Sequence, residues 1–214
     1  MEGIRKGLFY FNTTKIIAAN LFFFLIASVV LMTYPGAINY LALKPSSIIQ
    51  GKYLWTILTS MFMHGSVFHL FANMMSLFFL GGLLERIIGK KKFLLIYMIS
   101  GIIASLFFVL IAYAFQSDMD ALAVGASGAI FGIAGMLAVL TPKMPVYILF
   151  IPIALPMWLG AILILLVLWI ISAAFSIPIG NLAHLGGLLT GLAYAFYLKL
   201  KYPRKARIIS NHFR

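Results

Sequence analysis

The stretch VGASGAIFGIAGMLAVLT, residues 124–141, contains no charged side chain and places one serine, Ser127, near its start. Its length and apolar composition predict a helix that crosses a membrane. Small residues recur at Gly128, Gly132 and Gly135, and this spacing indicates a face that packs closely against another helix. The stretch therefore predicts a membrane span that carries a hydroxyl group on or beside a close-packing face.

The rest of the chain has the same character. Of its 214 residues, 64% are hydrophobic and 9% charged, and the mean hydropathy is +1.09, values outside the range of a soluble domain. We expect one all-α, polytopic domain over residues 1–214, with short basic tails at about 1–15 and 200–214. The predicted spans lie near residues 16–34, 67–85, 93–115, 124–141, 146–172 and 182–199.

Two segments do not fit a simple succession of membrane spans. Pro152 and Pro156 lie in the fifth predicted span, so that a kink or a later start near Met157 is an alternative. The connection from Pro35 to Ser66 is too long for a tight turn and mixes Trp55 with other large apolar and polar residues. This composition predicts an interfacial structure that lies among the lipid headgroups.

The positive charge is distributed unevenly between alternate loops. Of 16 lysines and arginines, only Lys44 and Lys52 fall on the side opposite to the termini. This bias predicts that both termini are cytoplasmic and that the number of spans is even. We expect a prokaryotic plasma membrane, with the basic C-terminal tail against anionic headgroups. The charge pattern does not favour a nucleic-acid partner.

Four polar side chains share one predicted depth. His69, Asn73, Ser127 and His184 each lie a few residues inside the second, fourth or sixth span, about 3 to 10 Å below the outer boundary. His69 and Asn73 are also separated by four residues, which places them on one helical face. The common depth predicts that these side chains meet in one layer of the membrane.

Each of these residues also has a purely structural interpretation. A serine in a membrane helix commonly bonds to its own backbone, and His69 with Asn73 could form a polar clamp between helices. An intramembrane histidine such as His184 is by default a functional candidate, since burying it is costly. We expect His64 to be a structural hydrogen-bonding residue, His212 to be solvated, and the acid of Glu85-Arg86 to belong to an end-of-helix pair. The structural and functional interpretations stay open for Ser127, His69 and Asn73.

The set of acids limits the chemistry. Glu2, Glu85, Asp118 and Asp120 are the only ones, and none is predicted inside the membrane beside His184. A Ser127–His184 pair can still act as nucleophile and general base. Phe131, one turn after Ser127, is placed to pack against the imidazole. The His69 ring, the Asn73 amide and the Ser127 backbone N–H are candidate donors for an oxyanion.

Four strings together carry a family resemblance: His64-Gly-Ser-Val-Phe-His69-Leu-Phe-Ala-Asn73, Gly81-Gly82-Leu-Leu-Glu85-Arg86, Gly125-Ala-Ser127-Gly128 and Ala183-His184-Leu-Gly-Gly187-Leu-Leu-Thr-Gly191. Their combination and order resemble the rhomboid intramembrane serine proteases. The resemblance implies a compact six-helix core, Ser127 as nucleophile, His184 as general base, and an oxyanion site at His69 and Asn73, without a metal or cofactor. Gly125, Gly128, Gly187 and Gly191 would allow the helices to approach closely.

The resemblance also implies substrates that are single-span membrane proteins, cleaved near their outer end at a small residue. One position departs from the family pattern, because Trp55 is followed by Thr56 where members often have arginine. Two alternatives remain from other classes of function. His64, His69 and His184 could hold a metal or a haem, or the chain could bind transmembrane helices without cleaving them.

Overall fold

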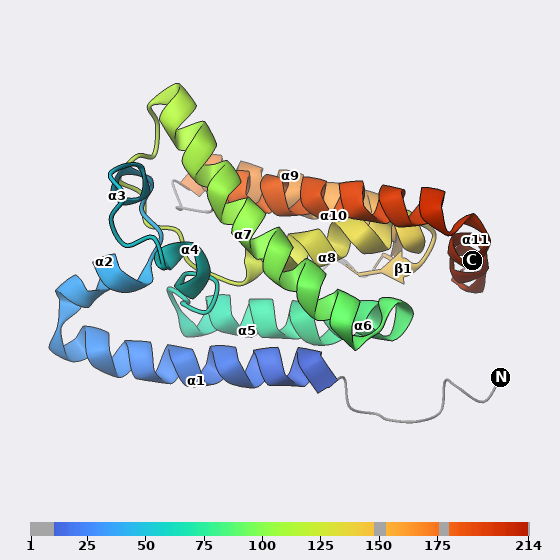
Figure 1. The fold of residues 1–214 in the computed structure, drawn as a ribbon, viewed down its shortest axis with the longest axis horizontal. Helices are drawn as coiled ribbons and strands as arrows, with labels where there is room; N and C mark the ends of the chain where they lie inside the picture. The colour runs from blue at the N-terminus through green and yellow to red at the C-terminus, as the bar shows by residue number, and fades with distance from the viewer. Residues whose placement is uncertain (1–10, 148–152, 176–179, 214) are drawn as a thin grey trace.

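The computed structural model describes residues 11–147, 153–175 and 180–213 (Figure 1). Its architecture is all-α, as predicted from the sequence. The long helices are α1 (Phe11–Thr33), α7 (Lys90–Phe115), α8 (Ser127–Leu140), α9 (Met157–Phe175) and α10 (Asn181–Lys201), together with a continuous helix built from α5 (Val67–Ser76), the π-helical turn η2 (Leu77–Gly81) and α6 (Gly82–Ile88). The short elements are η1 (Pro35–Ala37), α2 (Ile38–Leu41), α3 (Pro45–Ile49), α4 (Thr56–Thr59), β1 (Pro145–Val146), β2 (Leu155–Pro156) and α11 (Pro203–His212).

Within the described residues, four helices are long and apolar enough to cross a membrane by length and composition. They comprise Asn12–Thr33, Val67–Ile88, Lys90–Phe115 and Met157–Phe175. The apolar helix α8 is shorter, and its 14 residues extend only about 21 Å, against a hydrocarbon thickness of roughly 30 Å. The protein is therefore an integral membrane protein of polytopic, all-α architecture, and the count of six spans stays a prediction.

The fifth span begins later than residue 146. Instead of continuing a helix, Pro145–Val146 pairs antiparallel with Leu155–Pro156, and the backbone N–H of Met157 bonds to the carbonyl oxygen of Met144 at 2.9 Å. Pro156 has no N–H to donate and its fixed φ suits the residue before a helix, so that α9 starts at Met157. The alternative start near Met157 is thus confirmed, whereas Pro152 lies outside the described residues.

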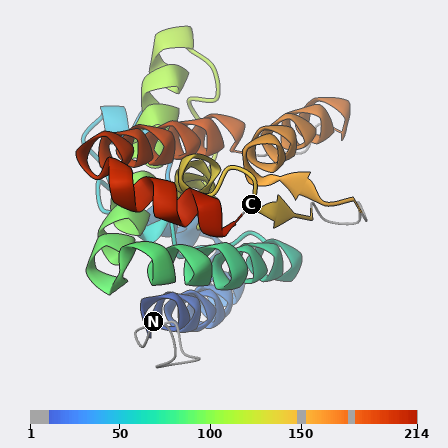
Figure 2. The same cartoon turned by 90° about the vertical axis from the view of Figure 1, so that its right-hand side faces the viewer.

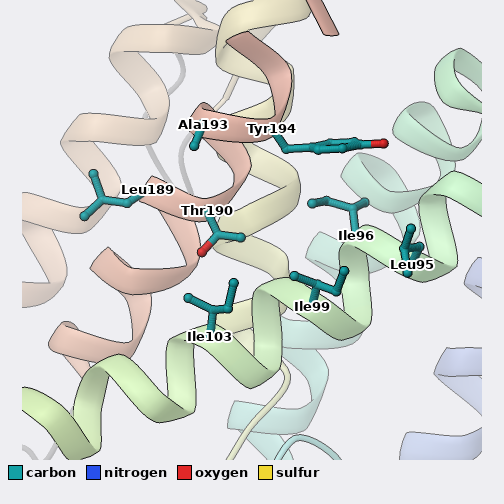
Figure 3. Close-up of a pocket in the computed structure, with 8 residues that line it drawn as sticks. All are labelled: Leu95, Ile96, Ile99, Ile103, Leu189, Thr190, Ala193 and Tyr194. Atoms are coloured by element: carbon teal, nitrogen blue, oxygen red, sulfur yellow. The ribbon is translucent and has the colours of Figure 1, made fainter. Parts of the chain in front are cut away.

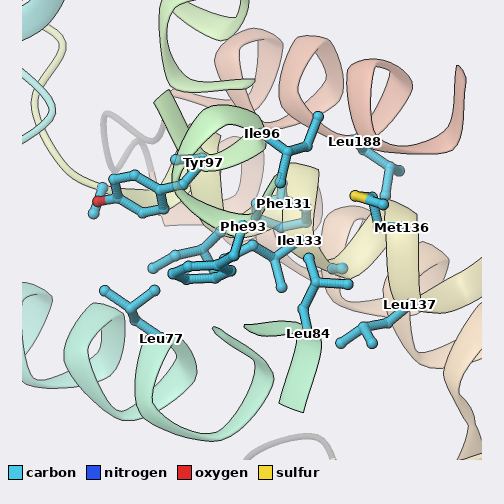
Figure 4. Packing of buried hydrophobic residues seen from close by; sticks show 14 of the residues in the cluster. Leu77, Leu84, Phe93, Ile96, Tyr97, Phe131, Ile133, Met136, Leu137 and Leu188 are labelled. Carbon is cyan, nitrogen blue, oxygen red and sulfur yellow. The ribbon is translucent and has the colours of Figure 1, made fainter. Parts of the chain in front are cut away.

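The helix α8 occupies the centre of the bundle and contacts α7, α9, α10 and η2. It is apolar on every side, as a helix enclosed by others must be. Figure 4 shows Phe131, Ile133 and Leu137 of α8 among side chains of the neighbouring helices, including Leu77 and Phe93. This central position holds the residues at the start of α8 in a fixed place.

Glycine allows α8 and α10 to touch through their backbones. A Cβ atom built on Gly187 would overlap the carbonyl oxygen of Gly128, and one on Gly191 would overlap the carbonyl oxygen of Gly132. Any side chain at these positions would separate the helices. The predicted close-packing face therefore brings the beginnings of α8 and α10 together.

Glu85 has hydrogen-bond partners that the sequence did not predict. Its buried carboxylate accepts hydrogen bonds from the backbone N–H of Asn12 (2.9 Å), the backbone N–H of Thr13 (2.9 Å) and the Thr13 hydroxyl (2.7 Å). The first backbone N–H groups of a helix have no partner inside it and carry partial positive charge. Glu85 thus caps α1 from a distant segment and ties it to α6.

The substitution Glu85→Gln is expected to lower the free energy of unfolding by about 2 kcal/mol. The glutamine side chain has no negative charge, and its NH2 group cannot accept the hydrogen bonds that Asn12 and Thr13 donate. Thermal denaturation in detergent measures the effect. Asp118→Asn is the matched control, since it makes the same charge change at an exposed position. Equal melting temperatures for the two variants would contradict the capping role.

The connection between α1 and α5 is held to the loop that precedes α8. Leu43 and Ala123 exchange two backbone hydrogen bonds, Ser46 N–H donates to Met119 O, and Gly125 N–H donates to Ser60 O. The Lys44 ammonium, 2.8 Å from the Asp120 carboxylate, and the Ser46 hydroxyl hold the pKa of Asp120 below its ordinary value. The two segments therefore form one unit beside the start of α8.

The position of the unusual Thr56 is explained locally. Its side chain is buried, and the hydroxyl donates to the carbonyl oxygen of Tyr53 at 2.7 Å. The indole N–H of the adjacent Trp55 donates to the carbonyl oxygen of Tyr40 at 2.9 Å. The threonine side chain is thus enclosed within the connection, and its hydroxyl has an acceptor there.

Candidate active site

Ser127 and His184 meet across the α8–α10 contact. The Nε2 atom of His184 lies 2.7 Å from the Oγ atom of Ser127, although 57 residues separate them in sequence. Ser127 is the first residue of α8 and His184 lies in the first turn of α10. When the imidazole proton is on Nδ1, Nε2 accepts a hydrogen bond from the serine hydroxyl. The geometry is that of a nucleophile and its base.

Phe131 orients the imidazole. Its ring stacks on that of His184 with centroids 4.6 Å apart and planes inclined by 20°. Within the described residues, the Nδ1 atom of His184 has no hydrogen-bond partner, and no carboxylate takes the place of a third triad member. An aromatic face therefore holds the ring where a Ser-His-Asp site would use an acid.

His69 and Ser127 border the same small space beside Gly125. A Cβ atom on Gly125 would lie 2.8 Å from Cε1 and 2.9 Å from Nε2 of His69, and 3.6 Å from Oγ of Ser127. Gly125 also has a φ of +120°, a conformation that L-residues with side chains rarely adopt. The glycine is thus required both by its backbone and by the imidazole that lies against it.

Asn73 lies one turn after His69 on the same helix, as predicted. Its buried side-chain amide donates one hydrogen bond to the carbonyl oxygen of His69 at 2.9 Å, and the amide carries a second N–H. The π-helical turn η2 follows directly after α5. Such wide turns frequently occur at functional sites.

His64 has the structural contacts expected of it. Its Nδ1 atom lies 3.3 Å from the carbonyl oxygen of Phe62, and its ring packs edge-on against His69 with centroids 5.1 Å apart. His212 is exposed on α11. Across residues 11–147, 153–175 and 180–213, no three His, Cys, Asp or Glu side chains are gathered in a way that could hold a metal ion.

Two contributors to the site were not identified from the sequence. Ser66 caps α5, because its Oγ accepts the backbone N–H of His69 at 3.1 Å. The signal was present, since a serine stands directly before the apolar run of α5. The Ser60 carbonyl, which accepts the Gly125 N–H at 2.8 Å, left no local signal because the two residues are far apart in sequence.

A groove of about 440 Å³ lies elsewhere, between α7 and α10 (Figure 3). Its lining is almost entirely apolar, and the hydroxyl of Thr190 bonds back to the carbonyl oxygen of Gly186. The lining residues are Leu95, Ile96, Ile99, Ile103, Leu189, Thr190, Ala193 and Tyr194. Neither Ser127 nor His184 is among them, and the polar side-chain groups of the lining are the hydroxyls of Thr190 and Tyr194.

Comparisons with known proteins agree with the family resemblance of the sequence motifs. Residues 51–201 match the family model described as Rhomboid domain. RHOMBOID-like protein 1 of Arabidopsis thaliana is 35% identical over 166 residues, covering 75% of this chain and 39% of that protein. The rhomboid protein YdcA of Bacillus subtilis (strain 168) is 42% identical over 82 residues, 38% of this chain and 39% of that protein.

The relatives also include Inactive RHOMBOID-like protein 8 of Arabidopsis thaliana, 35% identical over 117 residues, which cover 54% of this chain and 30% of that protein. The chain spans less than half of the length of each of these three proteins. Because the family model covers more than half of the chain, from the connection before α5 to the end of α10, the chain belongs to the rhomboid family.

Proposed function

We propose that the protein is an intramembrane serine endopeptidase that cleaves single-span membrane proteins. The observation that carries the proposal is the 2.7 Å contact between Ser127 Oγ and His184 Nε2, with Phe131 stacked on the imidazole. Rhomboids are generally serine proteases, but the relatives include Inactive RHOMBOID-like protein 8, so that family membership alone does not decide activity. The contact supplies the pair of groups that catalysis requires.

In this mechanism His184 Nε2 takes the proton of Ser127 as Oγ attacks the scissile carbonyl carbon. The resulting imidazolium then donates that proton to the leaving amine, and the acyl-enzyme forms. A water molecule, deprotonated by the same Nε2, hydrolyses the ester and restores the serine. Stacking on Phe131 keeps the ring aimed at Oγ through both steps.

The oxyanion requires donors next to Oγ. The backbone N–H of Ser127 is available because the first N–H groups of α8 have no partner within the helix. The His69 ring borders the same space at Gly125, and Asn73 carries a second N–H beyond the one bonded to His69 O. Each such donor contributes roughly 3 kcal/mol of transition-state stabilisation in comparable sites.

The test combines labelling with cleavage. The purified full chain is incubated with a fluorophosphonate probe, and separately with a model single-span substrate in liposomes. We expect covalent label on Ser127, located by peptide mass spectrometry, and two substrate fragments. A protein that binds the substrate but neither cleaves it nor takes the label would instead be a helix-binding member of the family. A Soret band or stoichiometric zinc would favour the metal or haem alternative.

The substitution Asn73→Ala is expected to lower the cleavage rate by about 10²-fold without abolishing it, because the Ser127 N–H and His69 remain as donors. Initial rates with the model substrate measure the loss. Asn39→Ala is the control, since Asn39 is an exposed asparagine that also bonds a local carbonyl oxygen. An unchanged rate in Asn73→Ala would remove this residue from the oxyanion site.

A further inference from the structure

Three lysine side chains from separate elements converge on one tyrosine ring. The Nζ atoms of Lys92 of α7, Lys201 of α10 and Lys205 of α11 lie 5.5, 5.7 and 5.8 Å from the ring centroid of Tyr202. Attraction of a cation to the ring face favours this arrangement, at about 0.5–1 kcal/mol each where exposed. Lys201 is also held by Tyr197, because its ammonium donates a hydrogen bond to the Tyr197 hydroxyl at 2.8 Å. Three ammonium groups around one ring also repel one another, so that the cluster attracts an anion.

The positions of these lysines are fixed by the fold. Pro203 disfavours a helical conformation at Tyr202, whose φ and ψ of −133° and 59° end α10, and α11 then runs across the end of the bundle (Figures 1 and 2). Ala206 of α11 is buried and Ile209 packs against the main core. The segment predicted to be a tail is therefore an anchored helix.

No carboxylate among the described residues faces the cluster. Glu85 is buried and its oxygens accept from α1, while Asp118 and Asp120 follow the far end of α7 (Figure 1). Arg204 and Arg207 add exposed positive charge on α11 itself. The anion that balances these charges must therefore come from outside the described chain.

Apolar side chains beside the lysines indicate where that anion resides. Leu200, directly before Lys201, is 82% exposed, and Ile208 of α11 is 65% exposed. A soluble anion would leave both side chains in water. A helix that carries exposed apolar residues among basic ones lies in a membrane interface, with the apolar groups against acyl chains and the ammonium groups at headgroup level.

We propose that Lys92, Lys201 and Lys205 bind the phosphate group of an anionic phospholipid, with Leu200 and Ile208 against its acyl chains. The site is at the end of the bundle opposite to Lys44 and Lys52 and is independent of the proposed proteolysis. Each lysine near an anionic membrane surface contributes roughly fivefold to affinity. Loss of two lysines therefore lowers affinity about 25-fold.

Native mass spectrometry of the purified full chain tests the site with an equimolar mixture of phosphatidylglycerol and phosphatidylcholine. We expect the wild type to retain phosphatidylglycerol preferentially and the Lys92→Gln/Lys205→Gln variant to lose that retention about 25-fold. The Lys44→Gln/Lys52→Gln variant makes the same charge change at the opposite end and is expected to retain the lipid. Lys92→Arg/Lys205→Arg, which keeps the charge, is expected to behave as the wild type.

Three results would overturn the proposal. The wild type could retain both lipids equally, or the two glutamine variants could lose phosphatidylglycerol to the same extent. Displacement of the lipid by an equal concentration of glycerol phosphate would show that the cluster recognises a soluble anion. Melting temperatures of all variants establish that any loss of lipid is not a loss of fold.

Discussion

Cleavage of a single-span substrate is expected to fall at least 10⁴-fold in both Ser127→Ala and His184→Ala, while each variant stays folded. Alanine at 127 removes the attacking oxygen, and alanine at 184 removes the atom that lies 2.7 Å from it and accepts its proton. Groups that act as one unit lose similar amounts when either is removed, so that the double variant should be no worse than the single ones. Initial rates in liposomes measure all three.

Matched controls separate catalysis from packing. Ser105→Ala removes a buried hydroxyl from the neighbouring helix α7, where it bonds the carbonyl oxygen of Ile57, and His212→Ala removes an exposed imidazole from α11. Both should cleave at the wild-type rate. Substantial cleavage by Ser127→Ala, with an unaltered melting temperature, would refute the serine mechanism.

The substitution Gly191→Ala is expected to produce the largest loss of stability, about 3 kcal/mol. The added Cβ would overlap the carbonyl oxygen of Gly132, which is backbone and cannot rotate away, so that α8 and α10 must separate. Separation also lengthens the distance from Ser127 to His184. Thermal denaturation should therefore show a lower melting temperature, and the folded fraction should cleave more slowly.

Gly36→Ala is the comparison for this prediction, because a Cβ on Gly36 meets no atom within 4 Å and its φ is not positive. Its melting temperature should match that of the wild type. If Gly191→Ala were equally stable, the direct backbone contact between α8 and α10 could not be what holds their first turns together.

Hydropathy predicted the long helices well because apolar composition over about twenty residues is itself the property that a span requires. It failed before Met157, where Pro145–Val146 pairs with Leu155–Pro156, since composition alone does not distinguish a short apolar strand from a helix. The charge of residues 200–214 predicts a basic tail, but the structure has the helix α11 there. One face of that helix is buried at Ala206.

The contact between Ser127 and His184 was predictable from residue types, since few polar groups occur in apolar helices and each needs a partner. The predicted depth did not distinguish a structural from a functional role for Ser127, His69 and Asn73. That distinction depends on the distances between side chains, which the sequence does not give. The role of Glu85 could not be predicted, because its partners Asn12 and Thr13 lie more than seventy residues away and a carboxylate beside Arg86 resembles an ordinary local pair.

The hydrogen bonds of Leu43 with Ala123, Ser46 with Met119 and Gly125 with Ser60 have a mechanical consequence. They couple the segment 35–66 to the backbone immediately before Ser127, two residues from the last of these bonds. If the protein cleaves peptides as proposed, a peptide that reached Ser127 by displacing segment 35–66 would either break these hydrogen bonds or displace Gly125 and, with it, Ser127. A substrate that entered without moving either segment 35–66 or the loop before Ser127 would leave the serine hydroxyl in place.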